Sequence, residues 1–487
     1  MHYISKPTLL RMFRSLLPLF TLWLTLEVAA QGYGDVWQFG YQVGLDFSAC
    51  EPVVITGANT GFEGTASICD ANGQLLFYTN TEKVWNQQHQ LMPNGTLYVG
   101  ANTLSQVLIA HVDAPTNSLY YIITTTIQGQ LPGRLRYHVV DMSEDGGLGD
   151  VVSVDNVLFA DTSTEHVGAV RHANGTDIWV VAHGYPGNTF LAYLLTTSGL
   201  STTPVVSSTG PAFVPCNSNV NTRGELKFSV DGTRLAISGN GVGNEPVSDL
   251  LALFHFDAAT GVVSDPLELP AARGEFGLSF SPDGYKLYGA TWKALNFLSS
   301  DVNTLYQFDL SSGDPATIIA SGQVILTTGI SEPFGSLKLA PDGRIYVASN
   351  GREYLGVIGS PDEPGAACDF QYDGLYLEGA TSGFGLNNYI EYVDCGSTST
   401  GAVSPVASGE LTLFPNPTDG LITVGGAVER KVHSIHLHDA AGREVMVVDV
   451  RAASTFAISR LSAGGYQATF LDENRGVVER RSIALMR

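Results

Sequence analysis

Alternating apolar and polar residues dominate residues 31–395, and the alternation recurs in similar segments. The three clearest copies are Leu226–Gly239, Leu278–Thr291 and Leu337–Asn350. Each copy has an alternating run, an Asp-Gly pair and a second alternating run. Asp-Gly supplies the positive φ angles of a tight hairpin. In the first copy Leu226, Phe228 and Val230 fall on one face and Lys227 and Ser229 on the other, which predicts a half-buried strand.

Weaker copies of this hairpin lie upstream, and further strands follow most copies. The weaker hairpins are Thr65–Asn80, Gln106–Thr125 and Ala169–His183. Predicted third strands are Leu135–Asp141, Phe190–Leu195, Leu251–Asp257, Leu305–Asp309 and Tyr354–Gly359, and predicted fourth strands include Val262–Leu269 and Thr317–Leu326. Four antiparallel strands in each repeat of about 50–60 residues is typical of a β-propeller blade.

Six such blades can be counted, and a seventh is composite. Phe384-Gly385-Leu386 echoes the start of the two preceding blades, but no hairpin follows it. Strands around Val36–Phe39 and Leu45–Ile55 would complete its sheet, so that joining the two ends of the ring removes exposed edges. We therefore predict an all-β chain with a seven-bladed β-propeller over residues 31–395; six or eight blades are the alternatives.

Composition agrees with a β-rich fold and excludes some partners. The 487 residues include 54 Gly, 22 Phe and 20 Tyr, a mixture that suits strands and tight turns and excludes disorder. Residues 31–409 carry 37 acidic and 13 basic side chains, a net charge of −24. Such a surface repels phosphate backbones and anionic lipids, so we expect no nucleic-acid partner.

The first 30 residues have the pattern of a secretory signal peptide. Three basic residues precede the apolar run Leu16–Leu26, and small residues then lead to a cleavage site between Ala30 and Gln31. The run is shorter than the roughly 20 residues that a membrane span needs, and we expect no transmembrane segment elsewhere. Five cysteines follow. An odd number leaves at least one outside intramolecular pairs, so we expect one or two disulfides, with the pairing open.

The composition changes beyond residue 395. Residues 396–409 (GSTSTGAVSPVASG) are small, polar and uncharged, and they predict a flexible linker. Residues 410–487 contain seven short alternating strands, which predict a small antiparallel sandwich. They are Leu411–Phe414, Leu421–Val424, His433–Leu437, Glu444–Val450, Thr455–Ile458, Tyr466–Leu471 and Val477–Ile483.

Three motifs in this module make it resemble the type A C-terminal sorting domain of the type IX secretion system. They are Phe414-Pro415-Asn416-Pro417 with Asp419-Gly420, then Asp439-Ala440-Ala441-Gly442-Arg443-Glu444-Val445, then Leu461-Ser462-Ala463-Gly464-Gly465-Tyr466. His438 departs from the family, which usually has an aromatic residue there. The resemblance implies export by the type IX machinery, removal of the module by a sortase-like peptidase within the linker, and either release or attachment to an anionic lipopolysaccharide.

The propeller region carries resemblances of its own. Hairpins such as Ser281-Pro282-Asp283-Gly284 look like those of WD40-like and lactonase-like propellers. The N-terminal half resembles an exported Bacteroidota propeller of unknown activity. The segments that carry this resemblance are Trp37-Gln38-Phe39-Gly40, Gly44-Leu45-Asp46-Phe47, Glu63-Gly64-Thr65-Ala66-Ser67, Leu75-Leu76-Phe77-Tyr78-Thr79, Val84-Trp85-Asn86 and Met92-Pro93-Asn94-Gly95.

No strong catalytic or metal-binding motif is present. The sequence contains no HExxH, GxSxG, Walker or EF-hand pattern. The acidic segment Asp141–Asp150 lacks the ligand register of a calcium loop. His436 and His438 share a strand face near His433, but no third ligand accompanies them. We predict no catalytic residue, no metal and no cofactor; calcium is compatible with the charge but has no motif.

Loop lengths indicate where a ligand would bind. With the strands of each blade lettered A to D outward, the A–B and C–D turns are short, whereas the B–C and D–A connections are long and emerge on one face. Long loops on a rigid scaffold often carry function. Candidate residues on this face are Glu63, Arg134, His183, Tyr185, Arg223, Trp292, Lys293, Arg352 and Tyr354. We expect Trp292 and Tyr185 to stack on sugar rings or to anchor a peptide.

These observations favour a protein that passes through the periplasm and works outside the cell or on its outer surface. We favour a non-catalytic module that binds extracellular glycan or protein. The alternative is a propeller hydrolase or lyase acting on extracellular polysaccharide or ester, and a third is a structural surface protein. A carboxyl pair with raised pKa values at the channel mouth would favour the enzyme, and an aromatic-rimmed face would favour binding.

Overall fold

The computed structural model describes two parts of the chain. In the first it describes residues 32–97, 106–125, 134–214, 222–239, 250–270, 274–292, 302–329, 331–393 and 395. In the second it describes residues 412–414, 421–425, 432–438, 443–449, 455–458, 460–462, 464–471 and 477–485. The predicted signal cleavage site and the whole predicted linker, residues 396–409, lie outside these ranges. The chain separates into two compact units, Met1–Thr398 and Ser399–Arg487.

The described strands of the first unit form seven antiparallel sheets, numbered here in chain order. Sheet 1 contains β1 (Val36–Phe39), β2 (Tyr41–Asp46) and β3 (Val53–Thr60); sheet 2 contains β4 (Ala66–Cys69), β5 (Leu75–Thr79), β6 (Lys83–Asn86) and β7 (Leu91–Thr96). Sheet 3 contains β8 (Val107–Ala110), β9 (Leu119–Thr124), β10 (Leu135–Asp141) and β11 (Asp150–Phe159). Sheet 4 contains β12 (Ser163–Arg171), β13 (Ile178–Gly184) and β14 (Gly187–Thr196), with β15 (Gly199–Leu200) and β16 (Val205–Phe213) both paired to β14.

The remaining three sheets repeat the same order of four strands. Sheet 5 contains β17 (Leu226–Phe228), β18 (Arg234–Gly239), β19 (Leu250–Asp257) and β20 (Val262–Glu268). Sheet 6 contains β21 (Glu275–Phe280), β22 (Lys286–Thr291), β23 (Val302–Asp309) and β24 (Gln323–Gly329). Sheet 7 contains β25 (Leu337–Leu339), β26 (Ile345–Val347), β27 (Tyr354–Ile358) and β28 (Phe370–Tyr376). Short helical segments are α1 (Pro315–Ala320) and two 3₁₀ turns, Asp145–Gly147 and Gly365–Cys368.

The predicted hairpins are present, but the expectation of a half-buried first strand was wrong. In sheet 5, Leu226 pairs with Ile237 around a turn in which Gly232 has φ +69°. Lys227 is only 6% exposed and Ser229 1%, whereas Val230 is 37% exposed. The strand is buried on both faces because it is the innermost of its sheet and its polar face lies against other chain segments rather than water.

The prediction of a strand over Thr317–Leu326 was also partly wrong. Residues Pro315–Ala320 form α1, and β24 begins only at Gln323. Asp314 caps this helix, because its carboxylate accepts a hydrogen bond from the Thr317 N–H, and Pro315 occupies the first turn. This combination is a helix-start signal, and it outweighed the short apolar run that follows.

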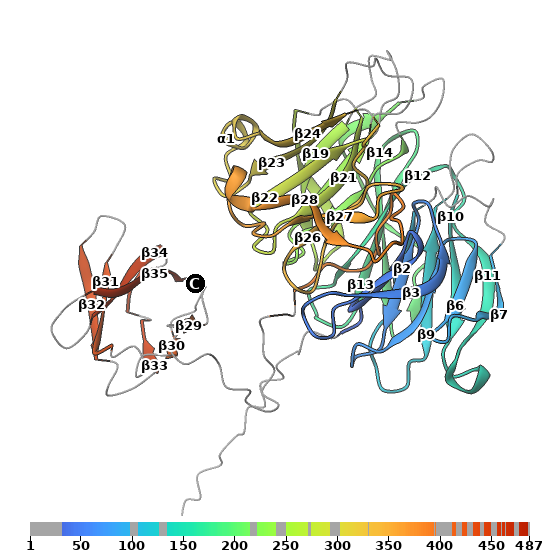
Figure 1. The fold of residues 1–487 in the computed structure, drawn as a ribbon, viewed down its shortest axis with the longest axis horizontal. Helices are drawn as coiled ribbons and strands as arrows, with labels where there is room; N and C mark the ends of the chain where they lie inside the picture. The colour runs from blue at the N-terminus through green and yellow to red at the C-terminus, as the bar shows by residue number, and fades with distance from the viewer. Residues whose placement is uncertain are drawn as a thin grey trace, which may run out of the picture. The chain divides into compact units, whose positions relative to one another are not determined.

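The seven sheets are arranged in a closed ring. The first strand of each sheet contacts the first strand of the next, from β1 through β4, β8, β12, β17 and β21 to β25. Sheet 7 then packs on sheet 1, where the ring of Tyr346 lies 5.8 Å from that of Trp37 and 5.6 Å from that of Phe47. The blue strands β2 and β3 accordingly lie beside the orange β26 (Figure 1).

The end of the first unit enters this ring. Residues 384–393, named here the channel segment, contact sheets that are not neighbours. The Asn387 side chain accepts a hydrogen bond from the Ser67 N–H of sheet 2 (2.7 Å), and the Asn388 side-chain amide donates to the Val167 carbonyl of sheet 4 (3.3 Å). Because sheet 3 lies between those two sheets, the segment runs inside the channel. Just before the segment, Thr381 forms an isolated β-bridge with Tyr41 of sheet 1.

Buried ion pairs hold the C-terminal part of the channel segment, around Glu391. Lys338 Nζ of sheet 7 lies 3.1 Å from a Glu391 carboxylate oxygen and donates a hydrogen bond to the Tyr389 carbonyl (2.6 Å). Lys227 Nζ of sheet 5 lies 3.9 Å from the same carboxylate. Lys338 is 3% exposed, so this pair is shielded from water.

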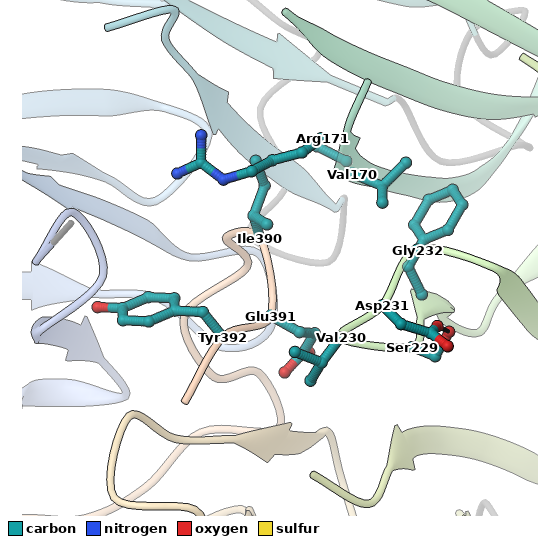
Figure 2. Close-up of a pocket in the computed structure, with 11 residues that line it drawn as sticks. Val170, Arg171, Ser229, Val230, Asp231, Gly232, Ile390, Glu391 and Tyr392 are labelled. Carbon is teal, nitrogen blue, oxygen red and sulfur yellow. Dashed lines mark hydrogen bonds between the residues drawn. The ribbon is translucent and has the colours of Figure 1, made fainter. Parts of the chain in front are cut away.

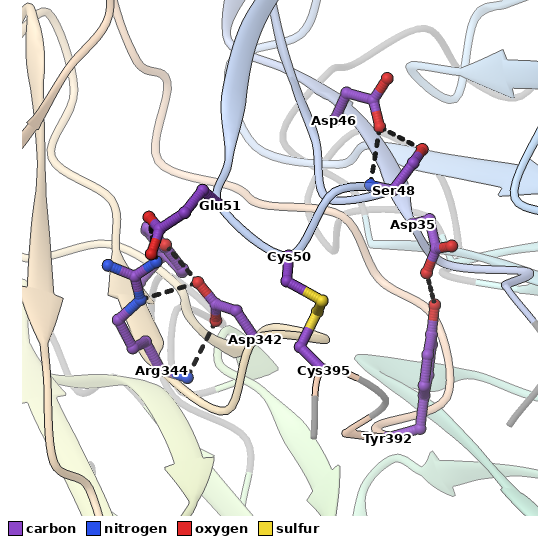
Figure 3. Close-up of a disulfide and its surroundings, with 10 residues drawn as sticks. Asp35, Asp46, Ser48, Cys50, Glu51, Asp342, Arg344, Tyr392 and Cys395 are labelled. Atoms are coloured by element: carbon purple, nitrogen blue, oxygen red, sulfur yellow. Dashed lines mark hydrogen bonds and ion pairs between the residues drawn. A yellow bond between two sulfur atoms is a disulfide. The ribbon is translucent and has the colours of Figure 1, made fainter. Parts of the chain in front are cut away.

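A disulfide closes the ring covalently (Figure 3). Cys50, in the turn between β2 and β3, is bonded to Cys395, 345 residues away. Beside it, the Tyr392 hydroxyl donates to Asp35 Oδ1 (2.6 Å). Cys69 and Cys368 are buried thiols, and the fifth cysteine, Cys216, lies outside the described residues. One of the one or two expected disulfides is therefore present, and it ties the channel segment to sheet 1.

The second unit contains the seven strands predicted for it, paired in two antiparallel sheets. One has the order β29 (Thr412–Phe414), β30 (Leu421–Gly425), β33 (Thr455–Ala457). The other has the order β32 (Glu444–Asp449), β31 (Ser434–His438), β34 (Gly464–Leu471), β35 (Val477–Leu485). Ile435, Leu437 and Phe470 are fully buried in its core.

Candidate functional site

Five buried polar side chains mark the points where successive inner strands begin. Each stands before, or within the first three residues of, the inner strand of its sheet, and none is more than 6% exposed. We name them the entrance ring: Glu63, Gln106, Glu165, Glu225 and Glu275. Only Glu63 was a sequence candidate. The sequence pattern that could have identified the other four is a Glu or Gln that recurs at the start of consecutive repeats.

Two members of the entrance ring have structural partners. Glu225 accepts a hydrogen bond from the Leu278 N–H of sheet 6 (2.8 Å), and Lys227 Nζ lies 3.4 Å from its other carboxylate oxygen. Glu275 accepts a hydrogen bond from the hydroxyl of Tyr306. The Glu225 carboxylate therefore links sheet 5 to sheet 6, and the Glu275 carboxylate links β21 to β23.

Glu63 and Glu165 are different. The Gln106 amide donates to Glu63 Oε1 (3.1 Å), whereas neither carboxylate oxygen of Glu165 has a hydrogen-bond partner. Burial raises the pKa of Glu165 to about 8, and burial together with Glu165 raises the pKa of Glu63. The Arg223 guanidinium acts on both in the opposite direction. The Thr125 hydroxyl, directly after β9 of sheet 3, lies within hydrogen-bond distance of the carbonyls of both Gln106 and Glu165 (3.2 and 3.3 Å), so Glu63 and Glu165 lie on either side of Gln106.

The nearby histidines add no positive charge. His183 is fully buried, with Nδ1 2.7 Å from the Gly184 carbonyl and Nε2 without a partner. Burial lowers its pKa to about 3, helped by His166, and burial lowers the pKa of His166 to about 4. Both rings are therefore neutral near pH 7, and neither offsets the charge of Glu165.

The structure places Trp292 and Tyr185 among other aromatic side chains. The Trp292 ring lies 4.3 Å from that of Phe384 and 5.4 Å from that of Phe276. Tyr185 is 8% exposed and belongs to a hydrophobic cluster with Phe213. Arg134 and Arg223 are half-buried, and Lys293 lies outside the described residues.

Arg352 and Tyr354 lie elsewhere, in an exposed aromatic group on sheets 7 and 1. We name this group the tyrosine surface: Tyr41, Arg352, Tyr354, Tyr372 and Tyr376. Tyr41 is 38% exposed and Tyr376 47%, and the rings of Tyr354 and Tyr376 lie 5.0 Å apart. The Arg352 guanidinium lies over the Tyr372 ring, 4.1 Å from its centroid.

Two carboxylates and the backbone hold this surface in place. Arg352 pairs with Asp373 and, at 3.6 Å, with Glu332. The Arg352 carbonyl also accepts a hydrogen bond from the Ser382 N–H (2.9 Å). The tyrosine surface therefore presents rings beside fixed donors and acceptors, although the sequence patterns pointed only to Arg352 and Tyr354.

A cavity of about 140 Å³ lies at the opposite end of the channel from the entrance ring, between β12, the Asp-Gly turn of sheet 5 and the channel segment (Figure 2). The Arg171 side chain extends away from Asp231 in this cavity. Asp231 accepts hydrogen bonds from Ser229 and Thr233, and Glu391 is paired with Lys338. The carboxylates that line the cavity therefore already have hydrogen-bond or ion-pair partners within the protein.

Among the sorting-domain motifs, Arg443 is exposed and Gly465 lies in β34. The Tyr466 hydroxyl donates to the Ser462 carbonyl (2.7 Å). Pro415, Asn416, Pro417, Gly420 and Gly442 lie outside the described residues. His436 and His438 are half-buried, and no cluster of three metal-ligating side chains occurs anywhere in the described residues.

Residues 412–484 match the family described as the secretion system C-terminal sorting domain. This tail implies export by the type IX secretion machinery to the cell surface or the medium, and it agrees with the resemblance inferred from the three motifs. In the part of the chain that the structure describes, no helix is long and apolar enough to cross a membrane.

Solved structures resemble the chain only in fold, and no curated protein matches it. A functionally unknown protein from Desulfotomaculum acetoxidans has a TM-score of 0.41 and 11% identity, over 73% of this chain and 99% of its own. The Dos1 propeller has a TM-score of 0.38 and 10% identity, over 73% and 75%. A streptogramin B lyase has a TM-score of 0.34 and 12% identity, over 65% and 83%. These structures say nothing about what this chain binds.

Proposed function

We propose that the chain is an exported seven-bladed propeller whose tyrosine surface binds an extracellular glycan. The observation that carries this proposal is the group of tyrosine rings, with Tyr41 and Tyr376 exposed and Tyr354 half-buried, held beside the ion-paired Arg352. Tyrosine rings offer an apolar face to the C–H groups of a sugar, and tyrosine hydroxyls can add polar contacts. The charge of −24 over residues 31–409 favours a neutral glycan over a polyanionic one.

We further propose the processing that the two ends of the chain imply. A signal peptidase would cleave between Ala30 and Gln31, and a sortase-like peptidase would cut within residues 396–409. The released propeller would then be free or attached to anionic lipopolysaccharide in a bacterium of the Bacteroidota. Cys395 precedes the linker, so a cut there keeps both cysteines of the disulfide in the propeller.

The test is retention of the purified full chain in native gels that contain neutral polysaccharides. The variant is Tyr354→Ala/Tyr376→Ala, and the matched control is Tyr285→Ala, another exposed tyrosine with an arginine over its ring, on an Asp-Gly turn. We expect the double variant to weaken retention about tenfold or more, since each stacking ring contributes about 1 kcal/mol, and the control to be retained normally. Normal retention of the double variant would contradict the proposal, and retention of polypeptides alone would favour a protein ligand.

A second candidate is a hydrolase or lyase acting on polysaccharide or ester. Glu63 and Glu165 favour it, because a carboxylic acid that stays protonated near pH 7 can act as a general acid. Release of reducing sugar or acid from the same panel, lost in Glu165→Gln but kept in the tyrosine variant, would establish the enzyme. A folded chain that neither retains nor cleaves any glycan would favour a structural role.

A further inference from the structure

Of the buried carboxylates in the channel, Glu275 accepts the Tyr306 hydroxyl, and the other four, Glu63, Glu165, Glu225 and Glu391, have only two buried lysines among them. Glu225 and Glu391 each lie within 4 Å of a lysine ammonium, at 3.4 Å from Lys227 and 3.1 Å from Lys338. Within the described residues, no such ion pair reaches Glu63 or Glu165. The fold therefore compensates two of these four carboxylates with ammonium groups and leaves two without one.

Of these two carboxylates, Glu165 has fewer hydrogen-bond partners than Glu63. It is 1% exposed and neither oxygen has a hydrogen-bond partner. Ser163 Oγ, two residues earlier in β12, and His183 Nε2, in the adjoining β13, also lack partners. A buried charge without partners costs free energy, so the two unpartnered carboxylate oxygens of Glu165, with Ser163 Oγ on the same strand, indicate a ligand that supplies a partner.

We propose that Glu63 and Glu165 form a binding site for a primary ammonium group at the entrance-ring end of the channel. One ammonium carries the single positive charge that the pair lacks beside Arg223. Its three N–H donors match the two free oxygens of Glu165 and one oxygen of Glu63. The channel shows the same chemistry elsewhere, where Lys338 Nζ contacts Glu391 and donates to the Tyr389 carbonyl.

Other cations fit this site less well. A divalent metal ion needs several anionic or neutral oxygen ligands, and the described residues hold no cluster of three metal-ligating side chains. Arg223 already acts on both carboxylates and would repel a second positive charge more strongly when that charge is double. A primary ammonium on a narrow side chain compensates the two carboxylates with one positive charge. The site goes beyond the proposed glycan surface and does not depend on it.

The experiment is calorimetric titration of the purified full chain at pH 7 with n-butylamine, which mimics a lysine side chain, and with D-glucosamine. Their neutral counterparts, n-butanol and D-glucose, are the ligand controls. We expect an amine to bind at least tenfold more tightly than its neutral counterpart. Repeating the titration in buffers of different ionisation enthalpy should show proton release from the protein, because Glu165, whose pKa burial raises to about 8, gives up its proton when the ammonium binds.

Glu165→Gln keeps the shape of the side chain and removes its charge, and Glu363→Gln, an exposed site, is the matched control. We expect the first to weaken amine binding at least tenfold and the second to leave it unchanged. Binding of butylamine alone identifies a lysine side chain as the natural group, and binding of glucosamine identifies an amino sugar. Should Glu165→Gln fail to fold, Glu63→Gln takes its place. Equal binding of amine and neutral counterpart, no binding of either, or full binding by the glutamine variant would overturn the proposal.

Discussion

Glutamates at equivalent positions in successive sheets have different roles in this protein. Glu225 accepts the Leu278 N–H and lies beside Lys227, so it joins two sheets. Glu165 stands at the start of the preceding inner strand without a hydrogen-bond partner. The difference comes from the neighbours, because a lysine two residues after Glu225 supplies a positive charge whereas Val167 stands at the corresponding place after Glu165.

This difference predicts a pH dependence of stability. Burial raises the pKa of Glu165 from 4.5 to about 8, so the folded chain holds a proton that the unfolded chain releases. This carboxyl therefore makes the free energy of unfolding fall as the pH rises from about 4.5 to about 8, by at most about 1.4 kcal/mol per pH unit for its one proton. Glu63 acts in the same direction and Arg223 against it. His166 and His183, whose pKa values burial lowers, make the free energy of unfolding rise with pH up to about 6.5, so only the difference between wild type and a Glu165 variant isolates the carboxyl.

Glu165→Gln should make this fall shallower, as measured by urea unfolding at pH 5 and pH 8. The Gln side chain has no proton to lose, so the variant should gain stability relative to the wild type mainly at pH 8. Glu363→Gln, whose side chain is exposed, should follow the wild-type curve. Parallel curves for the wild type and Glu165→Gln would show that this carboxyl ionises as readily in the folded chain as in the unfolded one.

Among the elements, the channel segment has the contacts that hold the ring together from inside. It bonds to sheets 2 and 4 through Asn387 and Asn388, and to sheets 5 and 7 through Glu391. The disulfide from Cys50 to Cys395 then fixes its end to sheet 1. A ten-residue stretch without a named strand thus contacts four of the seven sheets, and the disulfide just beyond it reaches a fifth.

We predict that Lys338→Met lowers the free energy of unfolding by about 3–5 kcal/mol, because it leaves Glu391 buried without its nearer cation. Lys286→Met is the control, since its partner Asp309 is 38% exposed, and its loss should be below about 1 kcal/mol. The double variant Lys338→Met/Glu391→Leu should recover much of the stability. Urea unfolding measures all three, and equal losses for Lys338→Met and Lys286→Met would show that the buried pair contributes no more than the surface one.

At the scale of the whole molecule, the two units have separate tasks. The first carries the closed ring with its entrance ring and tyrosine surface, and the second matches the sorting family over residues 412–484. The linker between them carries no charge and consists mainly of small residues. A tag that folds by itself can be recognised and removed without disturbing the unit that stays outside the cell.

Deleting residues 410–487 should therefore abolish export while leaving the propeller folded. We expect the truncated chain to accumulate in the periplasm, as measured by blotting cell fractions and medium, and to unfold at the same urea concentration as the first unit of the full chain. Double alanine substitution at Tyr354 and Tyr376, which lie in the first unit, should leave export unchanged. Undiminished secretion of the truncated chain would show that the tail is not the export signal.

The sequence by itself determined the strands, most of the turns and the division into two units. These features depend on short-range physics: period-two alternation marks strands such as Leu135–Asp141, and Asp231-Gly232 adopts a turn that few other pairs allow. The sequence also revealed the sorting module, because its motifs are contiguous. Even so, Pro315 with Asp314 shows that a local helix signal can be missed beside an apolar run.

Only the tertiary structure decided what surrounds each strand and which distant residues meet. Lys227 looked like the solvent side of a strand, and the ring placed it beside Glu225 and Glu391. From the sequence we expected the Trp292 ring to stack on a ligand, and in the structure this ring packs on Phe384. The Glu63–Glu165 pair and the Cys50–Cys395 disulfide join residues about 100 and 345 positions apart. Such contacts depend on ring closure, which no local pattern of residues encodes.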